Sequence, residues 1–347
     1  MIILGAGLSG LITAHYLMSK GLTVKVLESR DRIGGRIHTI VSENGTSVEM
    51  GATWLWQQHT HLFRLLEELG LSYYEQYMSG PIYYEPEANQ PIQKVQLPPQ
   101  ATSYRITGGS MALIKKLAEG LTDCIHTEEG AQSIDFSEQA KVEVVTNKSL
   151  YYGQAVVSTL PPQLLADTVK IVPALATDVV HHARNTHTWM HDSIKTSLVY
   201  SRPFWKQKGL SGAFFSNVGP VVEFYDHSDE SGKYYALCGF VNGSCAALET
   251  AERKKQVIDQ LYKVFGEQAQ AYEECIEVSW RDEKYTSSGT QDLVPHQLNG
   301  HHIYQQPLYN GKLWLSGTET SNVYPGYMEG AVYRAMEVSK RILHSDE

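Results

Sequence analysis

A glycine-rich turn near the N-terminus, Gly5-x-Gly7-x-x-Gly10, restricts the possible folds of this chain more than any other feature of its sequence. An apolar, strand-like run over residues 2–4 leads into the turn, and leucine and isoleucine at helical spacing follow it. A second run, rich in β-branched residues, ends at Glu28. The order strand, turn, helix, strand predicts a βαβ unit, and such units build parallel sheets. We therefore expect an α/β fold with a doubly wound, Rossmann-like parallel sheet.

The spacing of these glycines suits the phosphates of a dinucleotide. Gly5 permits the turn, Gly7 lets the backbone approach the pyrophosphate, and Gly10 lets the helix pack on the sheet. The helix offers free N–H groups and its positive dipole end at the same place, and Ser9 lies inside this turn. Glu28 can accept hydrogen bonds from adenosine ribose hydroxyls. These five residues form the first predicted cofactor-binding set, which fits both NAD and FAD.

The residues that follow Glu28 separate the two cofactors. A second glycine pair, Gly34-Gly35, comes shortly afterwards, and three basic residues surround it: Arg30, Arg32 and Arg36. Two backbone loops and several cations suit a long cofactor whose phosphates lie between the loops. Without the glycine pair, the arginines would be an ordinary solvated charge cluster. The combination favours FAD.

Length and composition narrow the remaining choices. A chain of 347 residues is long enough for two domains. The formal net charge of -9 weighs against nucleic acid, which clustered Lys and Arg would have to neutralise. The four cysteines include no CxxC pair, so we expect no metal site. Met1 runs straight into the first strand, and no apolar run approaches the roughly 20 residues of a membrane span. We expect no membrane segment and a cytoplasmic location.

Segments typical of the parallel sheet lie at both ends of the chain, so a second domain must be inserted between them. The patterns predict helices at 59–71, 251–265 and 327–343, a hairpin over 141–157, a mixed segment over 186–283 and a strand at 313–315. Residues 80–104, rich in Pro, Gln and Tyr, predict an irregular excursion. We expect one domain to bind FAD and a smaller α+β domain to bind the substrate: residues 1–79, 104–185 and 284–347 for the first, and residues 80–103 and 186–283 for the second.

Several segments resemble the flavin amine oxidase family, which also includes protoporphyrinogen oxidase and carotenoid desaturase relatives. The run from Glu28 to Arg36 resembles its extended FAD signature. Other matches keep the family order along nearly the whole chain: Glu49–Trp54, Gly108–Ser110, Ala131, Val156–Pro162, Leu315–Thr320 and Gly326–Ala331. The last two closely resemble the monoamine oxidase branch. The resemblance implies FAD as the cofactor and an amine as the substrate.

The resemblance also implies roles for residues around FAD. It places four residues beside the isoalloxazine ring, one at the adenine, one near the ribityl chain or phosphates, and three more along the cofactor: Gly51, Ala52, Thr53 and Trp54; Ala131; Glu319; and Trp280, Gly317 and Met328. The last helix begins just after Gly326, and its N–H donors and positive dipole end suit the electron-rich N1–C2=O edge of reduced flavin.

On the substrate side, residues 194–205 resemble the family segment that carries a lysine beside flavin N5. This match implies that Lys195 holds a water there and assists hydride delivery and flavin reoxidation. A lone lysine in a strand is more often an exposed residue, but the neighbouring Pro203-Phe204-Trp205 match favours the family role. Tyr327 then supplies one aromatic wall of the amine site, and Trp54 adds a face.

Two departures from the family pattern bear on the chemistry. Monoamine oxidases link their flavin to a cysteine, and alignment on Trp280 and Tyr285 places Gly289 at that position. We therefore expect noncovalent FAD. The adjacent position, the second wall of the family's aromatic cage, is Thr290 rather than Tyr. Family members also carry a long helical insertion that caps the active site, where this chain has only residues 80–104. We expect an open or partner-covered pocket.

These observations predict an FAD-dependent oxidase that transfers a hydride from the carbon next to a neutral amine to flavin N5, with oxygen as the acceptor. The expected partner is a small-molecule amine, with no nucleic acid and no membrane, and a homo-oligomer stays open. One alternative is a desaturase or dehydrogenase of the wider family, which the segment Tyr327–Gly330 disfavours. The other is an FAD-binding protein without turnover that acts with a partner.

Overall fold

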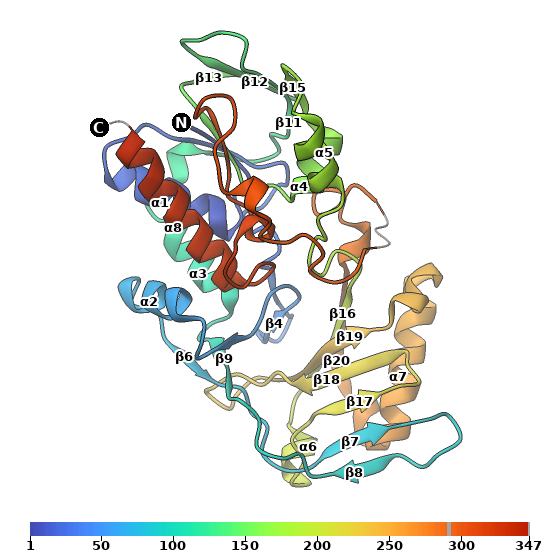
Figure 1. Ribbon diagram of the computed structural model, residues 1–347. Helices are drawn as coiled ribbons and strands as arrows, with labels where there is room; N and C mark the ends of the chain where they lie inside the picture. Colours follow the sequence, from blue (N-terminus) through green and yellow to red (C-terminus); the bar gives the residue numbers. More distant parts are fainter. Residues whose placement is uncertain (290–292, 346–347) are drawn as a thin grey trace.

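Both ends of the chain lie in the upper part of the molecule in Figure 1, and a five-stranded sheet includes strands from both of them. The computed structural model describes residues 1–289 and 293–345. Every pairing in this sheet is parallel, and its strands, in spatial order, are β10 (Ile125–His126), β2 (Lys25–Leu27), β1 (Ile2–Leu4), β14 (Val156–Ser158) and β21 (Leu313–Leu315). The sheet thus joins the two ends of the chain, which confirms the prediction of a parallel sheet completed by residues 313–315.

Helices cover one face of this sheet. They are α1 (Leu8–Ser19), α2 (Thr60–Glu68), α3 (Ser110–Ala118) and α8 (Met328–Ser345). Figure 1 shows α1 and α8 side by side. Leu11 of α1 and Val332 of α8 are fully buried against Ile3 and Val26 of the sheet. The apolar spacing that predicted the first and last helices is therefore the spacing of this core.

A four-stranded sheet covers the other face. Its strands are β13 (Leu150–Gly153), β12 (Val142–Thr146), β11 (Ala131–Asp135) and β15 (Lys170–Val172), followed along the chain by α5 (Thr177–Arg184), with α4 (Pro162–Thr168) before β15. β12 and β13 form the predicted antiparallel hairpin, and the chain then returns to the parallel sheet as β14. The predicted α/β class with a Rossmann-like parallel sheet is confirmed.

A seven-stranded sheet forms the lower part of the molecule (Figure 1). Its strands, in spatial order, are β20 (Tyr272–Ser279), β16 (Ile194–Tyr200), β19 (Tyr235–Val241), β18 (Val221–Asp226), β17 (Phe214–Ser216), β7 (Ile82–Glu85) and β8 (Gln93–Val95). Helix α7 (Thr250–Phe265) packs on one face, and α6 (Phe204–Gln207) lies at the end of β16. Every residue of β16 is buried. One face of this strand packs toward α7, and the other faces the upper part of the molecule.

The expectation of an irregular excursion over residues 80–104 is wrong in part. Residues 82–85 and 93–95 form β7 and β8 at the edge of the seven-stranded sheet. β7 pairs in parallel with β17, which lies more than a hundred residues later in the chain. A local sequence pattern cannot reveal a strand this short when its pairing partner is so distant.

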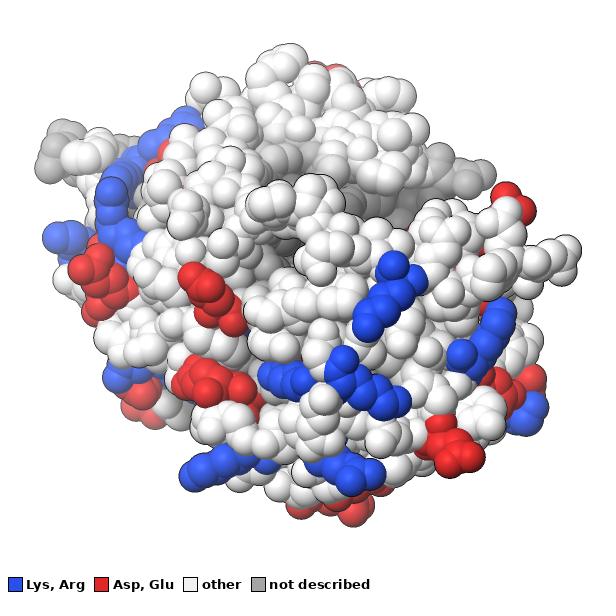
Figure 2. Space-filling model, turned by 90° about the horizontal axis from the view of Figure 1, so that it is seen from below, with Lys and Arg blue, Asp and Glu red and all other residues white. Residues whose placement is uncertain are grey.

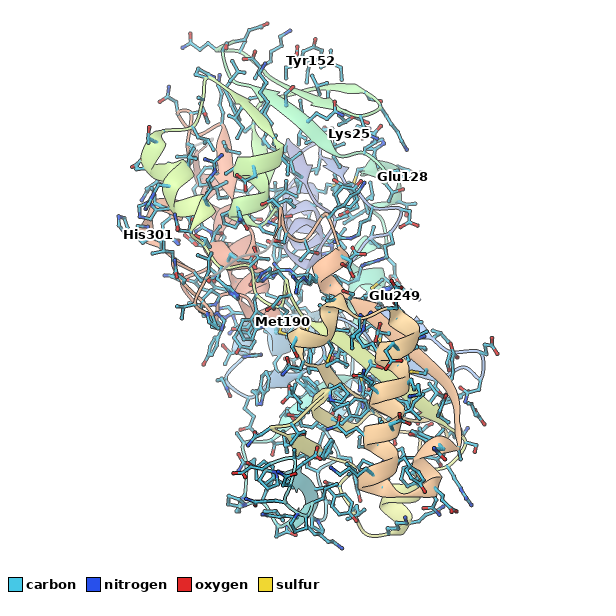
Figure 3. All side chains as sticks on the ribbon, turned by 90° about the vertical axis from the view of Figure 1, so that its right-hand side faces the viewer. Lys25, Glu128, Tyr152, Met190, Glu249 and His301 are labelled. Carbon is cyan, nitrogen blue, oxygen red and sulfur yellow. The ribbon has the colours of Figure 1, made fainter. Side chains whose placement is uncertain are left out.

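The remaining elements are short. They form a two-stranded and a three-stranded sheet and several 3-10 turns: β3 (Thr39–Val41) with β4 (Ser47–Glu49); β5 (Leu55–Trp56) with β9 (Ser103–Ile106) and β6 (Tyr73–Glu75); and η1 (Thr122–Cys124), η2 (Gly243–Ala247), η3 (Glu267–Gln270), η4 (Trp280–Asp282), η5 (His302–Tyr304) and η6 (Thr318–Thr320). Met190 lies at the junction between the parts in Figure 3. The exact domain boundaries given above stay a prediction.

The surface and the helices add two observations about partners. Figure 2 shows Lys and Arg scattered among acidic side chains on the lower face, with no continuous band of one sign. Within residues 1–289 and 293–345, no helix is both long and apolar enough to cross a bilayer.

Candidate active site

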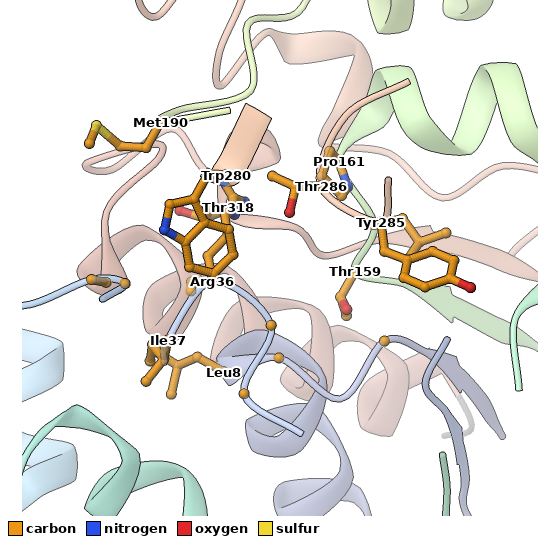
Figure 4. Close-up of a pocket in the computed structure, with 18 of the residues that line it drawn as sticks. Leu8, Arg36, Ile37, Thr159, Pro161, Met190, Trp280, Tyr285, Thr286 and Thr318 are labelled. Carbon is orange, nitrogen blue, oxygen red and sulfur yellow. The ribbon is translucent and has the colours of Figure 1, made fainter. Parts of the chain in front are cut away.

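A cavity of about 950 Å³ lies between the carboxyl ends of the parallel strands and the seven-stranded sheet. Leu4 and Leu27 end strands β1 and β2 at one side of it, and Lys195 and Phe240 of β16 and β19 face it from the other. Figure 4 shows its walls converging from distant segments, with Leu8 on α1 and Trp280 on η4. Ligands of open α/β sheets bind at this end of the strands.

The structure brings most of the predicted site residues together around this cavity. The following line it: Gly5, Gly7, Ser9, Glu28, Arg30, Gly34, Gly35, Arg36, Gly51, Ala52, Thr53, Trp54, Ala131, Lys195, Trp280, Tyr327 and Met328. Three predicted residues do not line it: Gly10, Gly317 and Glu319.

The two glycine loops lie against each other. Gly7 and Gly34 form an isolated parallel bridge, and a Cβ on Gly35 would stand 3.3 Å from the Gly7 Cα. Gly10 packs behind the turn, because its Cβ would come within 2.0 Å of the Gly5 carbonyl oxygen. The backbone of both loops therefore forms a cradle at the start of α1, where free N–H groups and the helix dipole attract phosphate.

Glu28 follows strand β2 and lines the cavity beside the glycine cradle. Its two carboxylate oxygens accept hydrogen bonds from the backbone N–H groups of Ala6 (2.8 Å) and Arg30 (2.9 Å). The Arg30 side chain donates to Glu283 and Thr286 and remains 3.9 Å from the Glu28 carboxylate. Glu28 is only 4% exposed but lines the cavity, so its remaining lone pairs can meet two ribose hydroxyls. A glycine cradle and a fixed carboxylate fit the pyrophosphate and adenosine of FAD.

Arg36 and Glu319 form a two-bond ion pair beside the cavity. The guanidinium donates to both carboxylate oxygens, at 2.5 and 2.9 Å, and also to the carbonyl of Trp189. Glu319 is fully buried behind Arg36, so its place is that of a partner for the arginine rather than a wall of the cavity. Gly317 likewise packs away from the cavity, with its Cβ position 3.1 Å from the Leu160 carbonyl oxygen.

Lys195 lies at the other end of the cavity, almost fully buried. Its Nζ donates to the Gly51 carbonyl (2.9 Å) and the Thr53 hydroxyl (2.6 Å), and it stands 5.2 and 5.3 Å from the ring centres of Trp54 and Phe240. Burial lowers the pKa of this ammonium group from its ordinary value. The lysine amine is thus held by the predicted isoalloxazine turn, and Lys195 is not an exposed strand residue.

A buried carboxyl lies on the far side of that turn. Glu49 accepts from the Ser110 backbone N–H (2.7 Å) and the Thr39 hydroxyl (2.9 Å), while its second oxygen is buried without a partner. Burial raises the pKa of Glu49. The Gly108–Ser110 loop therefore contacts Glu49 and not the cavity, since none of its residues lines the cavity.

Aromatic side chains enclose the space beside Tyr327. The Trp189 ring stacks on His296 with centres 4.3 Å apart, and His296 lies nearly parallel to Tyr327 with centres 5.9 Å apart. Trp189 and Tyr327 line the cavity. Trp189 gave no signal in the sequence because it follows a short polar stretch without periodicity. Thr290, the predicted gap in the aromatic cage, lies outside the described residues.

The segment aligned with the family's flavin-linking stretch lines the cavity in its first part, through Trp280, Lys284, Tyr285 and Thr286. Trp280 lines the cavity and donates its indole N–H to the Met50 carbonyl, 2.7 Å away. Gly289 is exposed and does not line it. None of the four cysteines of the chain lines it either.

Sequence reasoning missed the acidic wall of the cavity. Glu223 and Tyr225 of β18 line it beside Phe240, and the Tyr225 hydroxyl donates to the Glu223 carboxylate at 2.8 Å. Strand alternation from residue 221 to 226 could have indicated that residues 223 and 225 share a face, but nothing in the sequence places that face against the cofactor end.

This fold and this glycine cradle define a dinucleotide-binding oxidoreductase with a second, separately built substrate wall. The sequence matches the family described as flavin containing amine oxidoreductase over residues 8–102 and 93–343. The chain therefore belongs to this family and is an FAD-dependent amine oxidase by class. FAD is its cofactor, and none of the four cysteines lines the cavity, in keeping with the expected noncovalent binding.

Individual relatives are distant but cover the chain. A probable flavin-containing monoamine oxidase A of Dictyostelium discoideum is 25% identical, covering 99% of this chain and 97% of its own. Amine oxidase B of Bos taurus is 24% identical over 99% of this chain and 86% of its own. Among solved structures, cyclohexylamine oxidase from Brevibacterium oxydans (TM-score 0.87) and putrescine oxidase bound to putrescine (0.85) each share 21% identity, cover 99% of this chain and 98% of their own, and support the fold.

The alignment also shows that this chain is shorter than its relative. Its match with the Dictyostelium relative extends over 453 positions, so at least 106 of them have no counterpart among the 347 residues here. The two segments that match the family overlap at residues 93–102, within the segment 80–104 in which the sequence predicts the loss of a helical insertion.

Proposed function

We propose that this chain oxidises a small amine and that oxygen takes up the electrons. FAD, when bound, supplies the chemistry: it accepts the hydride from the carbon next to the amine nitrogen. The amine must be neutral to react, because its lone pair assists the departure of that hydride.

The dinucleotide end of the cavity supports the binding part of the proposal. Gly5, Gly7 and Ser9 at the start of α1 would hold the pyrophosphate, and Glu28 the adenosine ribose. Ala131 lines the same end of the cavity. Arg36, fixed by its ion pair with Glu319, places a positive charge beside the same cradle. These residues would hold the cofactor at the end of the cavity opposite Lys195.

The substrate end supports the reactive part. The Lys195 ammonium group is held by the Gly51 carbonyl and the Thr53 hydroxyl, so it can fix a water molecule without moving. Tyr327, Trp189 and Trp54 give this end an aromatic lining, which excludes bulk water and can orient an amine. The single observation that carries the proposal is that a fixed, buried lysine and an aromatic lining share one cavity with the glycine cradle.

Anaerobic reduction of the bound flavin tests the proposal. The purified holoprotein is mixed without oxygen with a panel of primary and secondary amines, and with alcohols of matched shape as controls. We expect one or more amines, and none of the alcohols, to bleach the flavin absorbance, and air to restore it with formation of hydrogen peroxide. Flavin that no amine bleaches would overturn the proposal, and bleached flavin that air leaves reduced would overturn oxygen as the acceptor.

A further inference from the structure

The two groups that hold the buried Lys195 amine are both uncharged. In the described part of the chain, its Nζ donates to the Gly51 carbonyl and the Thr53 hydroxyl. A buried ammonium group is costly unless an opposite charge lies near it, and without one the lysine loses its proton. The role proposed for Lys195 requires the ammonium form. Which acid balances its charge is therefore a question about the reactive end itself.

Three acidic groups act electrostatically on Lys195: Cys238, Glu49 and Glu223. Burial raises the pKa of Cys238, so it stays a neutral thiol, and its Sγ donates to the Glu49 carbonyl at 3.6 Å. Glu223 is half-buried and lines the cavity, where solvent screens its charge. Glu49 is buried, and the charge of a buried group is screened much less. Glu49 is therefore the acid best placed to balance the lysine.

Glu49 and Lys195 lie on the two sides of one turn. Glu49 ends strand β4, and Gly51, whose carbonyl holds the lysine, is two residues further along the chain. Two residues span at most about 7 Å. The end of β4 also packs on β19 at Cys238, and Cys238 pairs with Ser197, two residues from Lys195 on β16. The backbone thus brings the acid and the lysine together without a direct bond between their side chains.

The surroundings of Glu49 favour its ionised form. One carboxylate oxygen accepts from the Ser110 backbone N–H and the Thr39 hydroxyl, at the start of α3 where the helix dipole is positive. Burial raises the pKa of Glu49, whereas these two donors, Lys195 and Arg105 lower it. The second oxygen has no hydrogen-bond partner among the residues that the structure describes. The charge of this carboxylate is therefore free to act on the two cations.

His227 is a neutral member of this buried group. Its Nε2 accepts the backbone N–H of Glu49 at 3.0 Å, so the proton of the neutral ring lies on Nδ1. Burial, together with Arg105 and Lys195, lowers the pKa of His227 well below its ordinary value. Arg105 is buried and donates to the Ser228 carbonyl at 2.9 Å. The cations that share Glu49 are therefore Arg105 and Lys195.

We propose that Glu49 is the counter-ion that keeps Lys195 protonated and thereby sets the pH range in which the lysine can act at the flavin. Glu49 is then a positioning residue, because it acts through Lys195 and does not line the cavity. This inference rests on the proposed function, since it concerns the lysine of the same site.

Reoxidation of the flavin by oxygen tests the inference without an amine, whose own protonation would complicate the pH dependence. The holoprotein is reduced with dithionite and mixed with oxygen over a series of pH values. In the parent protein we expect the rate to fall as the pH rises through the pKa of Lys195, because a fixed cation assists this step. Lys195→Met should abolish the fall. Glu49→Gln keeps the shape and one acceptor, and it should move the midpoint of the fall to lower pH by roughly one pH unit.

An absorbance titration of the oxidised holoprotein, without amine or turnover, gives a second readout. Loss of a positive charge beside the isoalloxazine ring should shift the visible band, and the midpoint should move in Glu49→Gln as it does for reoxidation. The matched control is Glu85→Gln, a buried acid of β7 that bonds to Lys263 and Gln260 and does not line the cavity. It should leave both midpoints in place.

Two further variants cover the case in which Glu49→Gln does not fold. Glu49→Asp keeps the charge and should keep both midpoints near those of the parent protein. Arg105→Met removes the competing cation, so both midpoints should move to higher pH.

Midpoints that stay in place in Glu49→Gln, or that move equally in Glu85→Gln, would overturn the inference. So would a pH-dependent fall that persists in Lys195→Met, or midpoints that Arg105→Met leaves unchanged. Flavin that no amine reduces, in a protein whose spectral midpoint still moves in Glu49→Gln, would overturn the proposed function and leave the pairing of Glu49 with Lys195 standing.

Discussion

At the scale of single residues, Lys195 makes two buried hydrogen bonds that support the fold, and it also lines the cavity. Replacing it with Met keeps the aliphatic stem and removes the donor to Gly51 and Thr53. We expect flavin content to stay near that of the parent protein, while flavin reduction or reoxidation slows by roughly tenfold or more. The free energy of unfolding should fall by about 1–3 kcal/mol, because two buried acceptors lose their partner.

Stopped-flow absorbance and chemical denaturation measure these effects separately. Thr53→Val is the matched control, since it removes one partner of the ammonium group but leaves the charge in place. If both half-reactions of Lys195→Met run at the parent rate, the lysine serves the fold alone.

Glu28 gives a second prediction at this scale. The side chain accepts from two backbone N–H groups and has lone pairs left for the ribose. Glu28→Gln keeps one acceptor and loses the charge, so we expect the Kd for FAD to rise by roughly ten- to a hundred-fold. Fluorescence titration of FAD into the apoprotein measures this, with the exposed Glu43→Gln as the control. An unchanged Kd would remove Glu28 from the cofactor site.

At the scale of elements, the start of α1 depends on Gly10 without any contact between Gly10 and the cavity. A Cβ there would meet the Gly5 carbonyl oxygen at 2.0 Å, so Gly10→Ala must push the helix away from the glycine turn. We expect a loss of about 1–3 kcal/mol in unfolding free energy from overpacking and a clear fall in FAD content. Gly21→Ala, just past the other end of α1, meets no neighbouring atom but is strained by its positive φ of 85°, so it should lose stability and still keep its FAD. Equal FAD content in both variants would contradict this account.

The elements that sequence alone could predict are those with local signals. The glycine turn, the helix patterns and the hairpin depend on residues close together in the chain, and each appears as predicted. Strand β7 could not be found, because its partner β17 lies far along the chain. The same reason hides Glu223 and Trp189, which enter the cavity only because the seven-stranded sheet packs against the parallel one. Glu319 was placed close to FAD by its motif, and its side chain is instead used to hold Arg36.

At the scale of the whole molecule, the cavity lies between the five-stranded parallel sheet and the seven-stranded sheet. FAD would fill the space between Glu28 at one end and Lys195 at the other, and thereby join the upper and lower parts. Since no cysteine lines the cavity, acid precipitation should release yellow FAD into the supernatant.

A ligand that binds only the folded state raises its stability with the logarithm of ligand concentration. We therefore expect the Tm of the apoprotein to rise steadily as FAD is added, and riboflavin, which lacks the pyrophosphate and adenosine, to raise it much less. Differential scanning fluorimetry over a series of FAD concentrations measures the rise. A Tm independent of FAD, or flavin retained in the acid pellet, would show that the cavity does not link the two parts through a dissociable cofactor.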